Sequence, residues 1–534
     1  MQRGKIYWLV RNFIVAFLSF TRRKPLISFL CLALCSLFIF ISRAYIQPFV
    51  VLGRRFIFLE VMAVIVLLVW WRLFRNSGWK KKIVHALMFI FIGVGIYYAK
   101  LEPYNYMTLY LKYNSLNIEE LSSLPLTDHE RIHPQNSIKT LAQEAISETE
   151  TFNTPDYVRV GDGYRWTMAV EPQYFYQKIL ESVQEVISVS GLAPAPNFSG
   201  DNRRRVFFDV SENLKFGRNT RTAVTKRFGP LQFLSYQPSD VKYVTNDKGE
   251  WIQVVTLIRW DGIFFPTPSF GGVYIIRQGH YDMKDTVIRA FFGAGDFVAP
   301  EDFEKHPYLR KQNILPYEVS RFTANSFRFQ NGFLAPMPGY HKGDIRIPDL
   351  KEDINDQPFT TYFDFSGISP EMSMLYHYFG LEPFDYSKQG LNTSLFIPAD
   401  GTDRVYVYKH FERMESLTGV SAVAAKVIES RKEYDWSISK PVEHRPFIRE
   451  LQGQKRFFWL TTVVTFKNQV ANGKEAQSVS SGKNGEFFAG SVPDLIITDA
   501  IYKKPVWVDA SDPKSWESEL ESQLNSIWHL GESQ

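Results

Sequence analysis

Three apolar stretches near the start of the chain constrain its fold more than any other feature. They are Leu26–Ser42, Phe56–Trp71 and Ile83–Leu101, and their only charged or histidine residues are Glu60, His85 and Lys100. The hydrocarbon core of a bilayer is about 30 Å thick, and about 17–25 apolar residues in a helix cross it. The three stretches are therefore predicted to be transmembrane helices.

A fourth stretch, Ile6–Phe20, is apolar except for Arg11 near its middle. An arginine at the centre of a span costs at least about 2.5 kcal/mol, which disfavours a full crossing. Basic flanks together with Trp8 are typical of a helix that lies in the membrane interface. Whether this stretch spans the membrane or lies in the interface is left open by its sequence.

Charge is distributed unevenly along the chain. Residues 1–101 contain fifteen Lys or Arg and a single acid, Glu60, whereas residues 102–534 carry a net charge of −9. The high isoelectric point therefore belongs to the N-terminal segment, and no nucleic-acid partner is predicted. Basic residues concentrate before Leu26 and around Arg72–Lys82, which predicts a cytoplasmic N-terminus and places everything after Leu101 outside.

The portion after Leu101 contains no cysteine, because the two cysteines are Cys31 and Cys35. This excludes disulfides and cysteine-rich zinc sites there, and it favours the bacterial periplasm or cell exterior. Strand-like runs outnumber helical ones and do not alternate with them regularly. The predicted fold class is thus three transmembrane α-helices, with an interfacial helix where Ile6–Phe20 does not span, followed by a large extracytoplasmic α+β portion with mostly antiparallel sheets.

Three segments share the pattern of a β-hairpin. Residues 154–170, 239–260 and 444–466 each contain a β-rich run, a turn with glycine, and a second run with Trp166, Trp251 or Trp459. The predicted organisation has six parts: 1–25, a cytoplasmic or interfacial basic segment; 26–101, transmembrane helices; 102–150, a helical connector; 151–332, a first α+β subdomain; 333–358, a bridging loop; and 359–534, a second α+β subdomain.

One segment matches a zinc-peptidase motif literally. His129, Glu130 and His133 fit HExxH, in which two histidines one helical turn apart bind zinc and the glutamate activates water. Pro125 and Pro134 flank the segment too closely for a long helix. We therefore interpret the motif as a capped turn before a helix and keep these residues only as weak metal candidates.

An acidic loop provides a second weak metal candidate. Asp344, Asp349, Asp353 and Asp356 lie close together, and calcium prefers several oxygen ligands on a flexible loop. Their spacing matches neither the EF-hand nor the RTX pattern, so the other interpretation is a solvated acidic loop or one that docks on a basic partner. Glu60 and His85 are candidates of a different kind, because ionisable residues inside predicted spans are often functional.

The sequence favours a non-enzymatic function and predicts no cofactor, since it contains no phosphate-binding loop, dinucleotide fingerprint or nucleophile elbow. The favoured hypothesis is a membrane-anchored, extracytoplasmic scaffold or interaction protein of a bacterial cell envelope. It would sit in the inner membrane, with the lipid bilayer and either other proteins or a second copy as partners. The alternatives are a hydrolase that acts on envelope material and a subunit of a transporter or channel.

Overall fold

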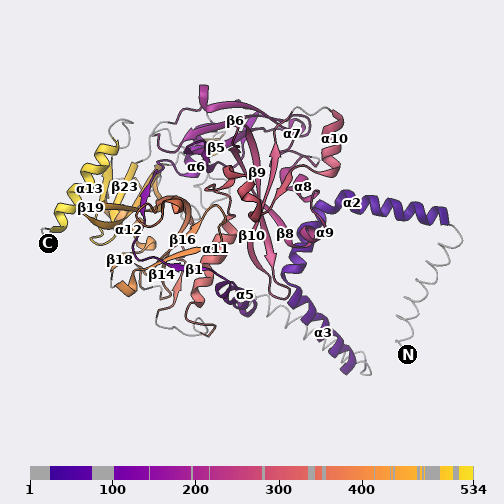
Figure 1. Cartoon of the computed structure of the whole chain (residues 1–534), viewed down its shortest axis with the longest axis horizontal. Helices are drawn as coiled ribbons and strands as arrows, with labels where there is room; N and C mark the ends of the chain where they lie inside the picture. The colour runs from indigo at the N-terminus through magenta and orange to yellow at the C-terminus, as the bar shows by residue number, and fades with distance from the viewer. Residues whose placement is uncertain are drawn as a thin grey trace.

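The computed structural model shows a body of several β-sheets from which two helices project (Figure 1). It describes residues 25–74, 78, 102–143, 145–193, 196–215, 217–279, 283–334, 343–350, 356–385, 387–413, 415–432, 435–436, 439–465, 470–471, 474–475, 494–508 and 516–532.

A seven-stranded sheet lies at the centre of the body. Its order is β1 (Ile118–Glu120), β17 (Val405–Lys409), β16 (Thr393–Pro398), β14 (Met374–Pro383), β13 (Phe359–Asp364) and β2 (Leu126–Asp128), with β12 (Ile345–Arg346) beside β14. Only the β1–β17 pair is parallel among the described pairs of this sheet. Because β1 and β2 are close in sequence yet take opposite edges, one short segment ties both sides of the sheet together.

Two antiparallel sheets pack face to face beside the central one. The first contains β3 (Glu150–Phe152), β4 (Asp156–Val160), β5 (Gly163–Pro172), β6 (Val183–Ser190) and β7 (Arg203–Phe208). The second has the order β11 (Asp296–Val298), β10 (Thr267–Arg277), β9 (Trp251–Asp261) and β8 (Tyr236–Thr245). Val186, Phe208, Val255 and Tyr274 are among the buried residues of the core that joins them. Branched and aromatic side chains dominate these strands, as expected for buried sheets.

A C-terminal antiparallel sheet covers the central sheet on another side. It contains β19 (Ser439–Leu451), β20 (Gln454–Thr465), β23 (Asp494–Asp499) and β24 (Pro505–Val508). Helix α12 (Val420–Ser430) fills the core between the two sheets, and α13 (Trp516–Glu532) packs on the opposite face. Two small pairs complete the described sheets: β15 (Gly390–Leu391) with β18 (Leu417–Thr418), and β21 (Val470–Ala471) with β22 (Lys474–Glu475).

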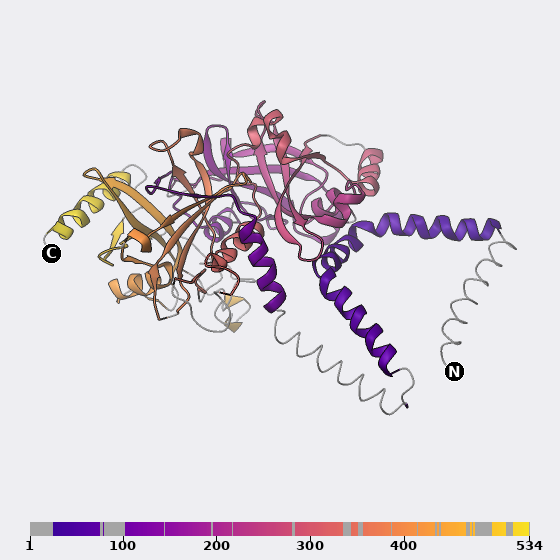
Figure 2. The same cartoon turned by 60° about the horizontal axis from the view of Figure 1, so that its bottom comes forward.

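The remaining α-helices are short except at the N-terminal end. They are α2 (Pro25–Arg55), α3 (Ile57–Phe74), α5 (Glu102–Asn114), α6 (Gln135–Gln143), α7 (Phe175–Leu180), α8 (Thr220–Thr225), α9 (Pro230–Ser235), α10 (Met283–Phe292) and α11 (Tyr317–Ser326). Helices α2 and α3 extend away from the sheets in both views (Figures 1 and 2).

The predicted fold class is wrong. The described part of the chain is mostly β-sheet with a few helices, and no helix in it is both long enough and apolar enough to cross a membrane. Leu26–Ser42 does not end as a separate span, because α2 continues to Arg55 through the polar residues Arg43 and Gln47. Phe56–Trp71 falls largely within α3. Ile6–Phe20 and Ile83–Leu101 both lie outside the described residues.

Candidate functional sites

The HExxH segment lies between β2 and α6 and is not helical. His129 is partly exposed and has a backbone φ of 52°, in the left-handed region. Glu130 forms an ion pair with Arg449 at 2.7 Å, and His133 is buried. Zinc binding by this motif requires both histidines on one face of a helix. The segment therefore does not form the zinc-peptidase arrangement.

Arg131, in the middle of this segment, has a structural role. Its guanidinium contacts the Glu443 carboxylate at 2.8 Å and lies over the rings of Trp166 and Tyr157. Glu443 sits at a β-bulge, where β19 gains one residue relative to β20. Arg445 donates to the backbone carbonyl of Arg131. Burial, followed by the Arg131 charge, lowers the pKa of Arg445 to about 10. The segment thus joins the β19–β20 hairpin to the β4–β5 hairpin.

The acidic loop does not gather its carboxylates at one point among the described residues. Asp344 is buried and accepts a hydrogen bond from the Asn331 amide at 3.3 Å. Asp356 pairs with Arg321 at 2.8 Å, and Asp349 is exposed. Asp353 lies outside the described residues. Within the described part of the chain, no group of three or more His, Cys, Asp or Glu is placed to hold a metal ion.

The two polar residues predicted inside the spans have different outcomes. Glu60 is exposed in the first turn of α3. His85 lies outside the described residues. The described residues therefore provide no observation that supports a role for Glu60 in transport.

A cluster of buried acids lies between the two sheets that pack face to face. Glu171 is fully buried and accepts hydrogen bonds from Ser211 and Asn213. Burial, followed by the charge of Asp156, raises the pKa of Glu212 to about 7. Asp156 contacts the fully buried Lys242 at 3.4 Å. Perturbed carboxyl groups are common at active sites, but burial inside a core produces the same shifts.

Helix α2 turns its polar face toward the sheet body and its apolar face outward, the reverse of a typical surface helix. The polar side chains of Arg43, Gln47 and Arg54 face the body: they donate to backbone carbonyls of Lys226, Phe233 and Trp260, respectively. Gln47 is only 1% exposed. The outer face carries exposed apolar residues at helical spacing: Phe38, Ile41, Tyr45, Phe49 and Leu52. A surface helix normally buries its apolar face and exposes its polar one.

Other elements beside α2 also expose large apolar side chains. The exposed residues are Leu231 and Leu234 of α9, Ile263 and Phe264 of the β9–β10 turn, and Val287, Ile288, Phe291 and Phe292 of α10. Phe40 of α2 and Phe292 of α10 have ring centroids 5.7 Å apart, which links two of these elements directly. We call these residues, together with the outer face of α2, the apolar rim. Its elements lie at one end of the body (Figure 1).

Comparison with protein-family models, with curated proteins and with solved structures finds no match to this chain. The apolar rim is therefore interpreted from its own residues. The sequence prediction misses the rim because it ends the first apolar stretch at Ser42, whereas α2 continues to Arg55. The signal was present in the apolar residues 38, 41, 45, 49 and 52, which recur every three or four positions.

Proposed function

We propose that the protein is a scaffold protein of a cell envelope that attaches to the surface of a lipid bilayer through the apolar rim. The sheet body would then be held beside the membrane, where it presents surfaces to protein partners or to a second copy. The reversed orientation of α2 is the observation that supports this proposal. Its hydrogen-bonding side chains contact the body, and its apolar side chains face outward.

Energetics favour an apolar environment for the rim. Moving one large apolar side chain out of water contributes about 1.5–3 kcal/mol, and the rim contains more than a dozen. Soluble monomers rarely expose apolar patches larger than a few hundred Å². Interfacial helices bury such a face at the boundary between headgroups and acyl chains.

Shape and charge favour a bilayer over a protein partner as the occupant of the rim. Helices α2 and α3 extend well beyond the sheet body, so their outer faces have no neighbouring described element to cover them (Figure 2). The first 101 residues have a net charge of +14, which complements anionic lipid headgroups.

A fluorophore at the rim is expected to report an apolar environment when the full-length protein is reconstituted into anionic vesicles. With both native cysteines replaced by alanine, Leu231→Cys and Ile263→Cys would each carry an environment-sensitive label. We expect a blue-shifted emission that brominated lipids quench, because both side chains would lie at the acyl boundary. Labels at Ile368→Cys and Phe411→Cys, which are exposed apolar positions outside the rim, are the matched controls. Equal emission and quenching at all four positions would contradict attachment through the rim.

The scaffold part of the proposal predicts an assembly. After mild detergent extraction, cross-linking followed by mass spectrometry is expected to recover a stable homo- or hetero-oligomer that contains the full chain. A monomer without any cross-linked partner would contradict the scaffold function but would leave the attachment experiment unaffected.

A further inference from the structure

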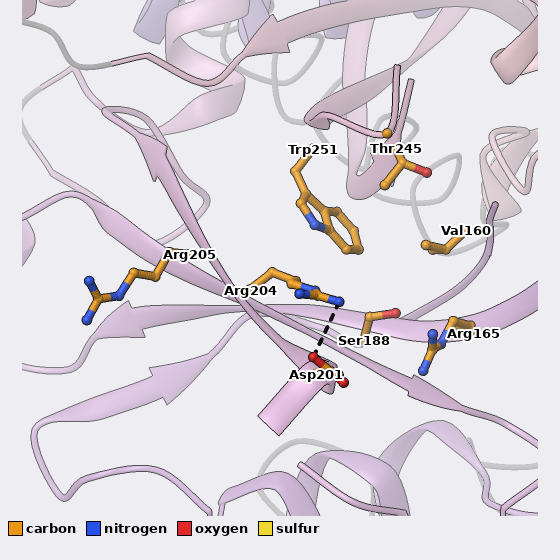
Figure 3. A pocket seen from close by; sticks show the side chains of 9 residues that line it. Val160, Arg165, Ser188, Asp201, Arg204, Arg205, Thr245 and Trp251 are labelled. Atoms are coloured by element: carbon orange, nitrogen blue, oxygen red, sulfur yellow. Dashed lines mark ion pairs between the residues drawn. The ribbon is translucent and has the colours of Figure 1, made fainter. Parts of the chain in front are cut away.

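A pocket of about 400 Å³ opens between the β3–β7 sheet and the β8–β9 hairpin. It is lined by Val160, Arg165, Ser188, Asp201, Arg204, Arg205, Thr245, Gly249 and Trp251. These residues come from β4 to β9 and from the turns between them. Their side chains are shown in Figure 3. A volume of this size lies within the range of small-molecule sites.

Strand register brings the pocket's polar groups to one face of the sheet. Ser188 pairs with Thr167, and Val186 pairs with Arg204. Paired residues share a face, as do residues two apart on one strand. Arg165, Ser188 and Arg204 therefore lie on the same face of three adjacent strands. Arg205 is on the opposite face of β7, and its side chain points away from the others (Figure 3).

Two polar groups in this pocket are buried without a partner among the described residues. The Ser188 hydroxyl has no hydrogen-bond partner there, although Ser188 is only 4% exposed. The buried Nε of Arg165 also has no hydrogen-bond partner among the described residues, while its Nη2 donates to the Asn202 side chain at 2.7 Å. A buried polar group without a hydrogen bond is destabilising, so such groups call for an explanation. A ligand in the pocket would accept from Arg165 and bond to Ser188.

The charged residues that line the pocket favour an anionic ligand. Arg165 and Arg204 line the pocket, and Asp201 is the only acid among its described lining residues. The Asp201 carboxylate is 3.8 Å from Arg204, but both side chains are exposed, so this pair is weak and a ligand anion can compete with it. Arginine recognises carboxylate and phosphate groups through two parallel N–H donors.

The rest of the lining suits a ligand that contains a ring. Part of the Trp251 indole forms the upper wall beside Thr245 (Figure 3). Gly249, in the turn before β9, adds no side chain and leaves the mouth open. An aromatic wall with hydroxyl groups next to it suits a sugar, which has apolar C–H faces and polar edges.

We propose that this pocket binds a small saccharide that carries a carboxylate or a phosphate. The anionic group sits between Arg165 and Arg204, the sugar hydroxyls bond to Ser188 and Thr245, and one face of the ring lies against Trp251. This proposal is independent of the membrane function, since the pocket and the apolar rim share no residue.

Isothermal titration of the full-length protein tests this assignment with four probes: glucuronate, glucose 6-phosphate, methyl glucoside and inorganic phosphate. Glucuronate or glucose 6-phosphate is expected to bind at least tenfold more tightly than either methyl glucoside or inorganic phosphate. Arg204→Gln is expected to weaken that binding at least tenfold, because it removes a charge-assisted contact. Ser188→Ala should also weaken it while leaving the melting temperature unchanged, since the hydroxyl has no described protein partner to lose.

Arg310→Gln is the matched control, because Arg310 is an exposed arginine in a weak surface pair with Glu304 at 3.4 Å. It should leave the affinity unchanged. Three results would overturn the proposal. They are no binding of either charged sugar at about 10 mM, equal affinity for inorganic phosphate and glucose 6-phosphate, and an affinity that Arg204→Gln does not alter.

Discussion

Replacing Glu443 with glutamine is expected to lower the free energy of unfolding by about 3–5 kcal/mol, the usual cost of removing one partner of a buried ion pair. Glu443 contacts Arg131 at 2.8 Å and Arg445 at 3.9 Å. All three side chains are about nine-tenths buried. Glutamine keeps the size and hydrogen-bonding oxygen of the side chain, so the variant removes little besides the negative charge.

The consequence of this change is two buried guanidinium groups that repel each other. Thermal and chemical unfolding of the full-length protein would measure the loss. Glu429→Gln is the control, since Glu429 is exposed and forms an ion pair with Lys426 along α12. A double variant with Arg131→Met should lose less than the sum of the two single variants, because the pair is coupled. A Glu443→Gln protein as stable as the Glu429→Gln protein would contradict the structural role of this cluster.

Several local elements could be predicted from the sequence because their signals are short-range. The three hairpins expected around Trp166, Trp251 and Trp459 are confirmed as β4–β5, β8–β9 and β19–β20. In the last of these, Gln452 and Gly453 both have positive φ, as a two-residue hairpin turn of type I′ requires. Alternating β-rich runs and glycine turns contain enough information to define such units.

The helical periodicity of apolar residues over Tyr174–Val189 predicts a helix there, and this prediction is wrong. The segment forms the short helix α7 and then strand β6. Apolar residues in this range satisfy both a helical and a strand pattern over a few positions, so periodicity alone cannot separate the two. Pairing of β6 with β5 and β7 decides the outcome. That pairing is a tertiary contact, and the local sequence does not encode it.

Neither the pocket nor the buried acids could be predicted from motifs. Arg165, Ser188 and Arg204 are separated by more than ten residues each and meet only through strand register. The literal HExxH match, by contrast, was visible at once but occurs in a bend whose charged residues form structural ion pairs. The residues of a sequence motif form a functional site only when the local backbone conformation places their side chains in the required geometry.

The protein is expected to lose stability as pH rises from about 4.5 to about 7, by about 3 kcal/mol from Glu212 alone. The pKa of Glu212 is raised to about 7, first by burial and then by the Asp156 charge. The folded state therefore keeps this proton up to pH about 7, whereas the unfolded chain releases it near pH 4.5. Unfolding between these values releases a proton, so the free energy of unfolding falls with rising pH.

Asp156 acts in the same direction over a lower range. Burial raises its pKa to about 6, although the Lys242 charge opposes the shift. Because the Asp156 charge itself contributes to the shift of Glu212, the two contributions overlap and do not simply add. The expected profile is a single broad decline, steepest between pH 5 and 7.

Glu212→Gln separates this mechanism from a general effect of pH on the protein. The glutamine side chain is neutral at every pH, so the variant should be about as stable as the native protein near pH 5 and about 2–3 kcal/mol more stable at pH 8. Melting temperatures measured from pH 5 to 8 would show a shallower slope for the variant. Glu429→Gln should keep the native slope, because the pKa of that exposed carboxyl is lowered by its hydrogen bond with Lys426. If Glu212→Gln declines as steeply as the native protein, Glu212 is already ionised in the fold. In that case its contact with Arg221 at 3.5 Å outweighs the effect of burial.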